Sequence, residues 1–448
     1  MDYVDISCMM EAEMNYWNKE TIKDFLGLLK ASLLIKDRYE EAVSVINGID
    51  FSNINWDEVY SAANINGTIP LLYPVIEYIR DNSDVIADDL ADKWKTGTKV
   101  NMIIELPKYT AIRRIIEKAS QADIKIVFFK GLILSDLYPS YLYRSSCDSD
   151  IFVDKKDIRA FENILEELGY VKKQSSSKEE VQVYKHPSMR HVVEAHTCLW
   201  EDYKGPRMDI LDRLSLTDKS TMVDLTACGI EVTTLGYEEH LIYQMFHIIK
   251  HFSLNGIGIK YLIDITLYVN KYLEFIDINR FWHKIDSLGY AKFTEYFFYV
   301  CHEYLGMTDE IYVQRNPKIG ENVLGFIIDL INLGNVNERE AGWQILGAME
   351  AYFTGEEKVS GTRFRRKIQM IFPSVNAMPK VYGYVKKYPI LLPVAWIHRY
   401  IKFINKKISQ KDNVYGMTEK INVAEKRLYL IKHLGLAEAI NDECRDDD

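Results

Sequence analysis

Residues 124–170, with the sequence IKIVFFKGLILSDLYPSYLYRSSCDSDIFVDKKDIRAFENILEELGY, decide the fold. The first six, Ile124–Phe129, are β-branched and aromatic apart from one lysine, which predicts a buried strand. Lys130 and Gly131 follow, and the apolar residues after them predict a short helix. Asp150–Val153 predicts a second strand, so the segment has the strand–helix–strand order of a core that mixes helices with a sheet.

The residues after this second strand have the pattern of an amphipathic helix. Asp154 is expected to cap that helix, with Asp157 at its third position as in a capping box, and Gly169 to end it. Two further strands are predicted at residues 181–185 and 191–196, after a polar loop. The expected buried stripe of the helix is Ile158, Phe161, Ile164, Leu165 and Leu168.

Helices are expected on both sides of this core. Helical periodicity predicts them at residues 22–34, 56–63 (with Asn55 as N-cap), 109–119, 241–252, 261–272, 282–288, 296–305 and 419–434. The predicted class is therefore α+β, a small mixed sheet flanked by helical regions. The expected parts are a helical region at 1–120, the sheet-containing core at 121–236, a helical domain at 237–357, and a basic helical region with an acidic tail at 358–448.

The composition excludes several classes of protein. The chain has 448 residues, 48% hydrophobic and 27% charged, which excludes a largely disordered protein. No run reaches the roughly 18 apolar residues that a membrane span needs, so no transmembrane segment is expected. The six cysteines are scattered without a CxxC pair, and the acidic N-terminus lacks the pattern of a secretory signal. We therefore expect free thiols and a cytoplasmic protein.

The net charge of −10 conceals a basic segment, Lys358–Lys411, with thirteen lysines and arginines and no acid. Such a segment predicts either a surface for an anionic partner or a solvated face that pairs with the acidic remainder of the chain. Within it, residues 388–404 have the pattern of a helix in a core, which we favour, or at a membrane interface. Nucleic acid is the less favoured partner because the chain as a whole is acidic.

Three acidic residues have the pattern of a metal site. Asp148 and Asp150 begin a strand, where side chains two apart point to the same face. Two carboxylates held close together repel each other, and a divalent cation such as Mg²⁺ relieves that repulsion. Glu194 lies in the apolar run HVVEAH, where a buried acid needs a partner or a metal. The alternative for the first two is a solvent-facing turn, since acid-x-acid triplets are common by chance.

Three neighbouring residues have the chemistry of a phosphate site. Gly131 lies at a strand-to-helix junction, where a glycine lets the backbone approach a phosphate and the helix N-terminus favours anions. Lys130 and Arg144 supply positive charge within reach of the two aspartates. In this setting the third carboxylate, facing the first two, would complete a two-metal site of the kind that activates a hydroxyl and stabilises a leaving pyrophosphate.

Histidines 240, 247 and 251 are spaced to share one face of a helix. An HxxxH pair can bind zinc, but the more common reading is a packed helix histidine. We favour a third role, in which His247 and His251, with Lys260 and Asp264, line the cleft opposite the carboxylates and bind nucleotide or acceptor.

Residues 125–170 resemble the core of the uncharacterised nucleotidyltransferase-like proteins, a family of the polymerase-beta-like nucleotidyltransferase superfamily. That family shows a strand, a KG turn, a helix ending in YP, the pattern RxxxDxD, a second strand, and a helix ending in LGY. The resemblance continues to residues 372–399 and so covers most of the chain. The matching residues are Lys130, Gly131, Tyr138, Pro139, Arg144, Asp148, Asp150, Gly169, Tyr170, Glu194, His196, His247, His251, Lys260 and Asp264.

Four positions depart from the usual pattern. The superfamily often has Gly-Ser where this chain has Lys130 and Gly131, and an apolar residue where it has Ser149. Glu194 stands where aspartate is more common, and Lys260 where arginine is. None of these changes removes a metal ligand.

The resemblance implies a site built around metal ions and a triphosphate. Asp148 and Asp150 would bind two divalent ions, Mg²⁺ or Mn²⁺, together with the triphosphate of an NTP. Glu194 would be the third ligand and would orient or deprotonate the acceptor hydroxyl. Gly131 would let the triphosphate approach, and Lys130 and Arg144 would neutralise charge that develops on the phosphates. The residues expected to contact the nucleotide are Lys130, Gly131, Arg144, His196, His247, His251, Lys260 and Asp264.

The predicted activity is transfer of a nucleoside monophosphate from an NTP to a hydroxyl or phosphate acceptor, with release of pyrophosphate. The acceptor is a small molecule, a peptide or a lipid-linked compound. One alternative is a phosphotransferase that moves the γ-phosphate. Another is a non-catalytic binding or scaffold protein of a cell-envelope or peptide-modification pathway, docked through the basic segment. Clustered acids argue against the scaffold, which has no need of them.

Overall fold

The computed structural model describes residues 19–173, 180–200, 213–254 and 257–315, and, further along the chain, residues 323, 326–327, 375, 378, 382, 384–399 and 434–436. The chain divides into two compact units, one of residues 1–250 and 257–335 and the other of residues 251–256 and 336–448. The helix predicted at 419–434 and the acidic tail lie outside the described residues, apart from residue 434.

The first unit begins with helices. Asn55 caps the third of them as predicted, since its side chain accepts a hydrogen bond from the Glu58 backbone N–H at 3.3 Å. The helix predicted at 109–119 is the last part of a much longer helix. The first half of that helix was not predicted because it is largely polar and buries only a narrow face. The helices are α2 (Lys19–Leu34), α3 (Tyr39–Asn47), α4 (Trp56–Ile65), α5 (Ile69–Asn82) and α6 (Asp88–Gln121), with the 3-10 turn η1 (Phe51–Asn53).

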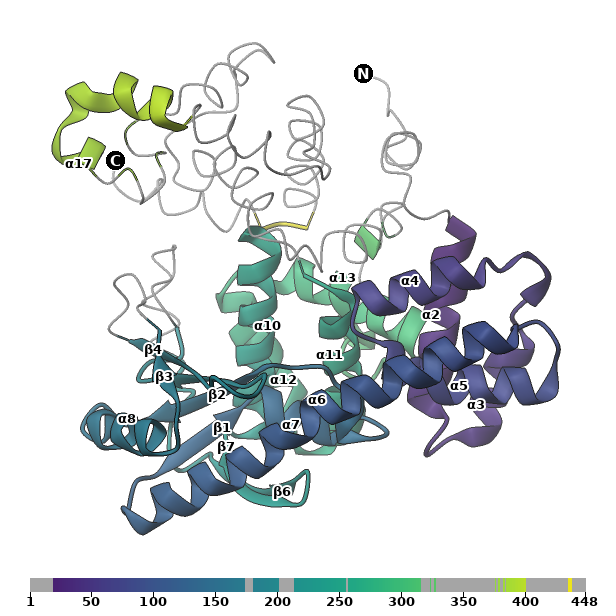
Figure 1. Ribbon diagram of the computed structural model, residues 1–448, viewed down its shortest axis with the longest axis horizontal. Helices are drawn as coiled ribbons and strands as arrows, with labels where there is room; N and C mark the ends of the chain where they lie inside the picture. Colours follow the sequence, from purple (N-terminus) through teal and green to yellow (C-terminus); the bar gives the residue numbers. More distant parts are fainter. Residues whose placement is uncertain are drawn as a thin grey trace. The chain divides into compact units, whose positions relative to one another are not determined.

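Helix α6 connects the N-terminal helices with the sheet. In Figure 1 it runs as one long helix from α5 to the strands. Its C-terminal half carries Tyr109, Ile112 and Ile115, which are buried in the same apolar cluster as strand residues Phe128 and Ile151. The helix is therefore anchored on the sheet, and polar residues that it carries nearby are placed close to the strand ends.

The sheet has seven strands in the order β3-β4-β5-β2-β1-β7-β6. Strand β1 pairs antiparallel with β2 and parallel with β7, and β2 pairs parallel with β5, while the outer pairs are antiparallel. A mixed sheet with helical flanks confirms the predicted α+β class. The strands are β1 (Ile126–Phe129), β2 (Asp148–Val153), β3 (Val171–Lys172), β4 (Val181–Lys185), β5 (Val192–His196), β6 (Val223–Ala227) and β7 (Ile230–Thr234).

Strands β6 and β7 form a hairpin that the sequence reasoning missed. Its two turn residues, Cys228 and Gly229, have φ of 53° and 68°. Positive φ at both central positions is the geometry of a tight type I′ turn, which matches the twist of the flanking strands. A cysteine at the first of these positions is a weak signal, because asparagine, aspartate and glycine are the usual residues there.

Three shorter helices surround the predicted motif. The capping prediction for the third of them, α8 (Ile158–Glu167), is wrong, because the residue before its first turn is Asp157 and not Asp154. The backbone N–H of Asp157 bonds the Asp154 carbonyl, so the chain makes one turn before the helix starts. Gly169 ends this helix with φ of +87°, as expected for a glycine after the C-cap. The helices are α7 (Gly131–Asp136), η2 (Tyr141–Tyr143) and α8 (Ile158–Glu167).

The predicted helices after the sheet are present. The first of them carries the predicted site residues His247 and His251 as well as His240, and the second begins next to Lys260. They are α10 (Tyr237–Leu254), α11 (Ile259–Tyr272), α12 (Ile278–Ser287) and α13 (Ala291–Leu305), with η3 (Leu273–Phe275) and η4 (Val313–Arg315).

The described part of the basic segment contains α17 (Tyr384–Lys387), η6 (Pro389–Leu391) and helical residues 392–399. Val385 and Ala395 are buried in a small apolar cluster, whereas Ile390 and Ile397 are 87% and 60% exposed. Across the described residues, no helix is both long and apolar enough to cross a membrane.

Candidate active site

The three predicted carboxylates are brought together by the pairing of β2 with β5. Asp148 and Asp150 are two residues apart on β2, and Glu194 of β5 lies directly opposite Asp150 in the parallel register. His196, two residues further along β5, has Nε2 at 3.4 Å from Asp150 Oδ1 and at 3.8 Å from Glu194 Oε2. The ligand atoms of Asp150, Glu194 and His196 all lie within 4.8 Å of one another. Sequence spacing predicted the β2 pair, and the strand register supplies Glu194.

The environment acts differently on two of the three carboxylates. For Asp148, burial favours the neutral acid, but Lys260, Lys130 and a hydrogen bond from Ser146 together hold its pKa well below the usual range. For Glu194, burial and the neighbouring charge of Asp150 raise the pKa to about 7. The cluster therefore combines a firmly ionised carboxylate with one whose charge is poorly compensated, which is a setting that a bound cation would relieve.

Lys130 lies between β1 and α7 and points at the carboxylates. Its Nζ is 2.9 Å from Asp150 Oδ1, and its side chain is 14% exposed. Burial disfavours the charged amine, but Asp150, through its charge and hydrogen bond, together with Tyr243 and Asp148 outweighs it, so the pKa of Lys130 lies well above its usual value. The backbone N–H of Lys130 donates to His240 Nε2 at 3.1 Å. Burial lowers the pKa of His240 to about 3, which keeps its imidazole neutral and able to accept that bond.

Gly131 is required for close packing between α7 and β2. A Cβ at this position would lie 3.0 Å from the backbone oxygen of Asp148. Positive φ occurs at the preceding residue, Lys130, with a value of +61°, and not at Gly131. Gly131 therefore allows α7 to pack closely against β2, the strand that carries the aspartates. Its predicted approach to a triphosphate stays a prediction.

We expect Gly131→Ala to destabilise the protein by about 1–3 kcal/mol, since the added methyl group meets backbone that cannot move alone. The same contact would displace Asp148, so weaker nucleotide binding should accompany the loss of stability. Gly48→Ala is the control, because its Cβ would meet the nearest atom at an ordinary 3.4 Å. Urea denaturation of both variants measures the difference, and equal stabilities would contradict the packing role.

Arg144 is held by Asp264 in a buried, two-pronged ion pair. Its Nε and Nη2 donate to Asp264 Oδ1 and Oδ2, each at 2.8 Å. Tyr138 donates to the same Oδ1 at 2.8 Å, and Arg144 Nη1 reaches the Gly131 carbonyl at 3.5 Å. Residues matched separately in the sequence therefore form one cluster that joins α7, the loop before β2 and α11. The guanidinium group of Arg144, which was expected to face phosphate, is directed at Asp264 instead.

A cavity of about 50 Å³ lies between this cluster, the two aspartates of β2 and helices α10 and α11, and neither Glu194 nor His196 lines it. Its lining includes Lys260 and His247 but not His251. A larger cavity, of about 500 Å³, is lined from α2, α3, α11 and α13 and contains none of the predicted site residues. The complete lining of the small cavity is Lys130, Gly131, Leu134, Arg144, Asp148, Asp150, Gln244, His247, Ile248, Lys260, Tyr261 and Asp264.

Gln244 is a site residue that the sequence reasoning missed. Its side chain is 4% exposed and lines the small cavity. The Nε2 atom of that side chain has no hydrogen-bond partner among the described residues. A buried amide without a partner is costly, so a ligand acceptor at this position would satisfy it. Gln244 falls between His240 and His247 on the same face of the helix, and that spacing is the signal that could have identified it.

The opposite face of β2 explains the polar residue between the two aspartates. Ser149 Oγ lies 2.9 Å from His191 Nε2, and Tyr170 Oη lies 2.6 Å from His191 Nδ1. All three groups are buried. A serine therefore replaces the usual apolar residue because it completes a hydrogen-bonded chain under the site.

The hydrogen-bonded row of Ser149, His191 and Tyr170 predicts a contribution to stability that is lost in acid. Burial, with Lys108 nearby, lowers the pKa of His191 to about 3, against about 6.5 in the unfolded chain. Below about pH 6.5 the unfolded state takes up a proton that the folded state refuses, so stability falls by up to about 1.4 kcal/mol per pH unit. We expect His191→Gln to reduce this slope in urea titrations between about pH 4 and pH 7.

Tyr170→Phe is the control for the histidine variant. It removes a hydrogen bond to His191 but keeps the imidazole, so the protein should lose stability at every pH while the slope remains. An unchanged slope in His191→Gln would show that this histidine is not the titrating group.

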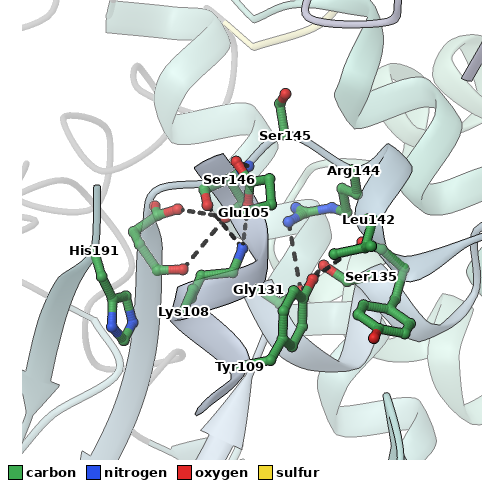
Figure 2. A network of polar contacts seen from close by, with 12 residues as sticks. Glu105, Lys108, Tyr109, Gly131, Ser135, Leu142, Arg144, Ser145, Ser146 and His191 are labelled. Carbon is green, nitrogen blue, oxygen red and sulfur yellow. Dashed lines mark hydrogen bonds and ion pairs between the residues drawn. The ribbon is translucent and has the colours of Figure 1, made fainter. Parts of the chain in front are cut away.

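Helix α6 positions Asp148 through a buried ion pair. Lys108 Nζ lies 2.7 Å from Glu105 Oε2, and both side chains are almost fully buried. Figure 2 shows this pair joined to Ser146: Lys108 donates to the Ser146 carbonyl at 2.8 Å, and the Ser146 N–H donates to Glu105 at 3.2 Å. The Ser146 hydroxyl in turn donates to Asp148 Oδ1 at 2.8 Å. No local feature of the sequence indicates this connection.

Comparison with known proteins places the chain in a family. The sequence pattern of the family described as "Uncharacterised nucleotidyltransferase" matches residues 52–306, which is more than half of the chain. Among curated proteins, none matches the chain.

Two solved structures of ANT(2″)-Ia show a distant likeness. The solution structure of this antibiotic-resistance factor shares 12% identity over 41% of this chain and 96% of its own, with a TM-score of 0.31. The crystal structure with adenylyl-2″-tobramycin shares 9% identity over 40% and 96%, with a TM-score of 0.30. A likeness this distant does not support a family assignment, so the assignment rests on the family match. That match spans the strands and helices that carry the carboxylate cluster, and the chain belongs to this family of uncharacterised nucleotidyltransferases.

Proposed function

We propose that the chain is a metal-dependent nucleotidyltransferase that moves a nucleoside monophosphate from an NTP to a hydroxyl or phosphate acceptor and releases pyrophosphate. The observation that carries this proposal is the register of β2 and β5, which sets Asp148, Asp150 and Glu194 at one cluster beside a cationic cavity. Family membership supports nucleotidyl transfer in general. The dependence on metal, the acceptor and the leaving group are our proposal.

The residues present fit a divalent ion with oxygen ligands. Asp148, Asp150 and Glu194 would hold it, because carboxylate oxygens are the ligands that Mg²⁺ and Mn²⁺ prefer. The ligand atoms of Asp150, Glu194 and His196 lie within 4.8 Å of one another, which is close enough for one ion to contact them together. A bound divalent ion would supply positive charge at the reacting phosphate and hold its oxygens in place.

The chain's own groups then have distinct tasks in the transfer. The acceptor oxygen bonds to the α-phosphorus, the bond from that phosphorus to the bridging oxygen breaks, and pyrophosphate leaves with the electron pair. Glu194 Oε2 lies at the more exposed side of the cluster, with 31% side-chain exposure, and is placed to orient the acceptor hydroxyl and take its proton. Lys130 and Lys260 add positive charge from within the cavity wall.

A nucleotide is too large for a cavity of about 50 Å³, so it is proposed to lie against the small cavity with only a phosphate group directed at it, where Gln244, His247 and Tyr261 offer polar and aromatic contacts. Arg144 and Asp264 would act here mainly by holding α7 and α11 together, with the guanidinium adding charge. Contacts of His196 and His251 with nucleotide stay predictions from the resemblance.

Labelling the donor separates this proposal from its closest rival. With α-labelled NTP and a mixture of small-molecule, peptide and lipid-linked acceptors, we expect label on an acceptor and pyrophosphate in solution. Transfer of label from γ-labelled NTP instead would identify a phosphotransferase. Failure to bind any NTP would favour the scaffold alternative, in which the protein docks within a cell-envelope or peptide-modification pathway through the basic segment Lys358–Lys411.

A further inference from the structure

The side chain of Lys130 lies where a cation belongs in the carboxylate cluster. Its Nζ is 2.9 Å from Asp150 Oδ1, the same oxygen that lies 3.4 Å from His196 Nε2. That oxygen belongs to the group formed by Asp150, Glu194 and His196, whose ligand atoms lie within 4.8 Å of one another. An ion that bridges Asp150 and Glu194 and the ammonium of Lys130 would therefore share one carboxylate oxygen.

The surroundings of this ammonium are built to hold it. The backbone of Lys130 has φ of 61° and ψ of −124°, a region that non-glycine residues occupy only when the structure around them enforces it. The bond from its N–H to His240 enforces it here. The Nζ also lies 5.5 Å from the ring centre of Tyr243 and 5.9 Å from that of Phe129. Aromatic faces attract an ammonium, whereas a Mg²⁺ ion requires close oxygen ligands.

The charges at the site also argue against a second divalent ion. Two lysines, Lys130 beside Asp150 and Lys260 acting on Asp148, already offset two of the three negative charges of the carboxylates, which leaves less attraction for a second divalent ion. A second divalent ion beside Asp150 would have to displace the ammonium from a pocket that is mostly closed to solvent, since the Lys130 side chain is 14% exposed. Displacement would leave a buried positive charge without its partner, which is strongly unfavourable.

We propose that the ammonium of Lys130 replaces one of the two metal ions, so that the nucleotide-loaded site holds a single divalent ion. This inference rests on the proposed metal-dependent nucleotide binding and corrects the two-ion expectation taken from the family resemblance. Lys130 then acts as a permanent internal cation on Asp150 and is present before any ligand binds. The departure from Gly-Ser at residues 130 and 131 acquires a chemical reason, because neither glycine nor serine can provide the charge.

Manganese counting tests the proposal without an assay of turnover. The wild-type protein is saturated with the α,β-methylene form of whichever NTP it binds, free Mn²⁺ is removed, and the bound ions per complex are counted. Electron paramagnetic resonance of the same sample reports whether two ions lie close enough to couple, as in sites with ions about 3.5–4 Å apart. We expect one ion and an uncoupled spectrum.

Two variants complete the test. Lys130→Met removes the ammonium and keeps the backbone bond to His240, so we expect two Mn²⁺ ions per complex. Lys260→Met is the matched control: it removes another cation of the same cavity, whose Nζ bonds the Ser145 carbonyl at 3.4 Å, and one ion should remain. Should Lys130→Met fail to fold, Lys130→Gln replaces it, and the wild-type count still decides.

The outcomes separate this inference from the function on which it rests. Two coupled ions in the wild type, or one ion in a folded Lys130 variant that binds nucleotide, would overturn the lysine replacement and leave the nucleotidyltransferase proposal intact. Absence of any metal-dependent nucleotide binding by the wild type would overturn both.

Discussion

Replacement of Asp148 by asparagine is expected to abolish metal-dependent nucleotide binding while the protein stays folded. Asparagine has the shape of aspartate and can still accept the hydrogen bond from Ser146 at the same oxygen. What it lacks is the negative charge, which Lys260 and Lys130 hold in the ionised form in the native protein. Loss of an ionised ligand should weaken binding at least as much as loss of a supporting contact, which is about 10–100-fold.

Calorimetric titration with the Mg²⁺ complex of the bound NTP measures this loss, and thermal unfolding confirms the fold. Asp154→Asn is the matched control, because Asp154 directly follows the same strand and forms only a surface ion pair with Lys219. Its binding should equal that of the wild type. Wild-type affinity in a folded Asp148→Asn protein would show that this carboxylate is no part of the metal site.

The second large effect is expected at the ion pair beneath the site. Lys108→Met leaves Glu105 buried without its partner and also removes the bond to the Ser146 carbonyl. Breaking a buried ion pair from one side destabilises a protein by about 3–5 kcal/mol, a large share of a typical total stability. Since Ser146 donates to Asp148, nucleotide binding should weaken as well.

Urea denaturation measures the change, and two further variants interpret it. Lys118→Met, on the same helix, breaks an exposed pair with Glu167 and should cost only about 0–1 kcal/mol. The double variant Glu105→Gln/Lys108→Met removes both charges and should recover much of the loss. If Lys108→Met were as stable as Lys118→Met, the buried pair would not support the site.

The parts of the site that the sequence predicted are those that depend on local periodicity. Alternation along a strand placed Asp148 and Asp150 on one face, and an acid within an apolar strand indicated Glu194. The helices that carry His247 and Lys260 followed from apolar spacing in the same way. The pairing of β2 with β5 was not contained in those patterns, because register depends on contacts between distant segments.

The contacts that the sequence did not predict join residues far apart in the chain. Arg144 and Asp264 are separated by 120 residues, and nothing local to either one indicates that they form a buried pair. Glu105 and Lys108 look like an ordinary pair three residues apart on a helix surface, and only the packing of α6 against the sheet buries them. Burial of a charge is a property of the assembled fold, so local pattern could not reveal it.

The central claim is that this cluster binds an NTP through a divalent ion, and one measurement tests it most directly. ATP, GTP, CTP and UTP, each with Mg²⁺, are titrated calorimetrically into the wild-type protein and again after the metal is removed with a chelator. We expect at least one NTP to bind with Mg²⁺ and the heat of binding to disappear without it. A folded protein that binds none of the four, with Mg²⁺ or with Mn²⁺, would contradict it.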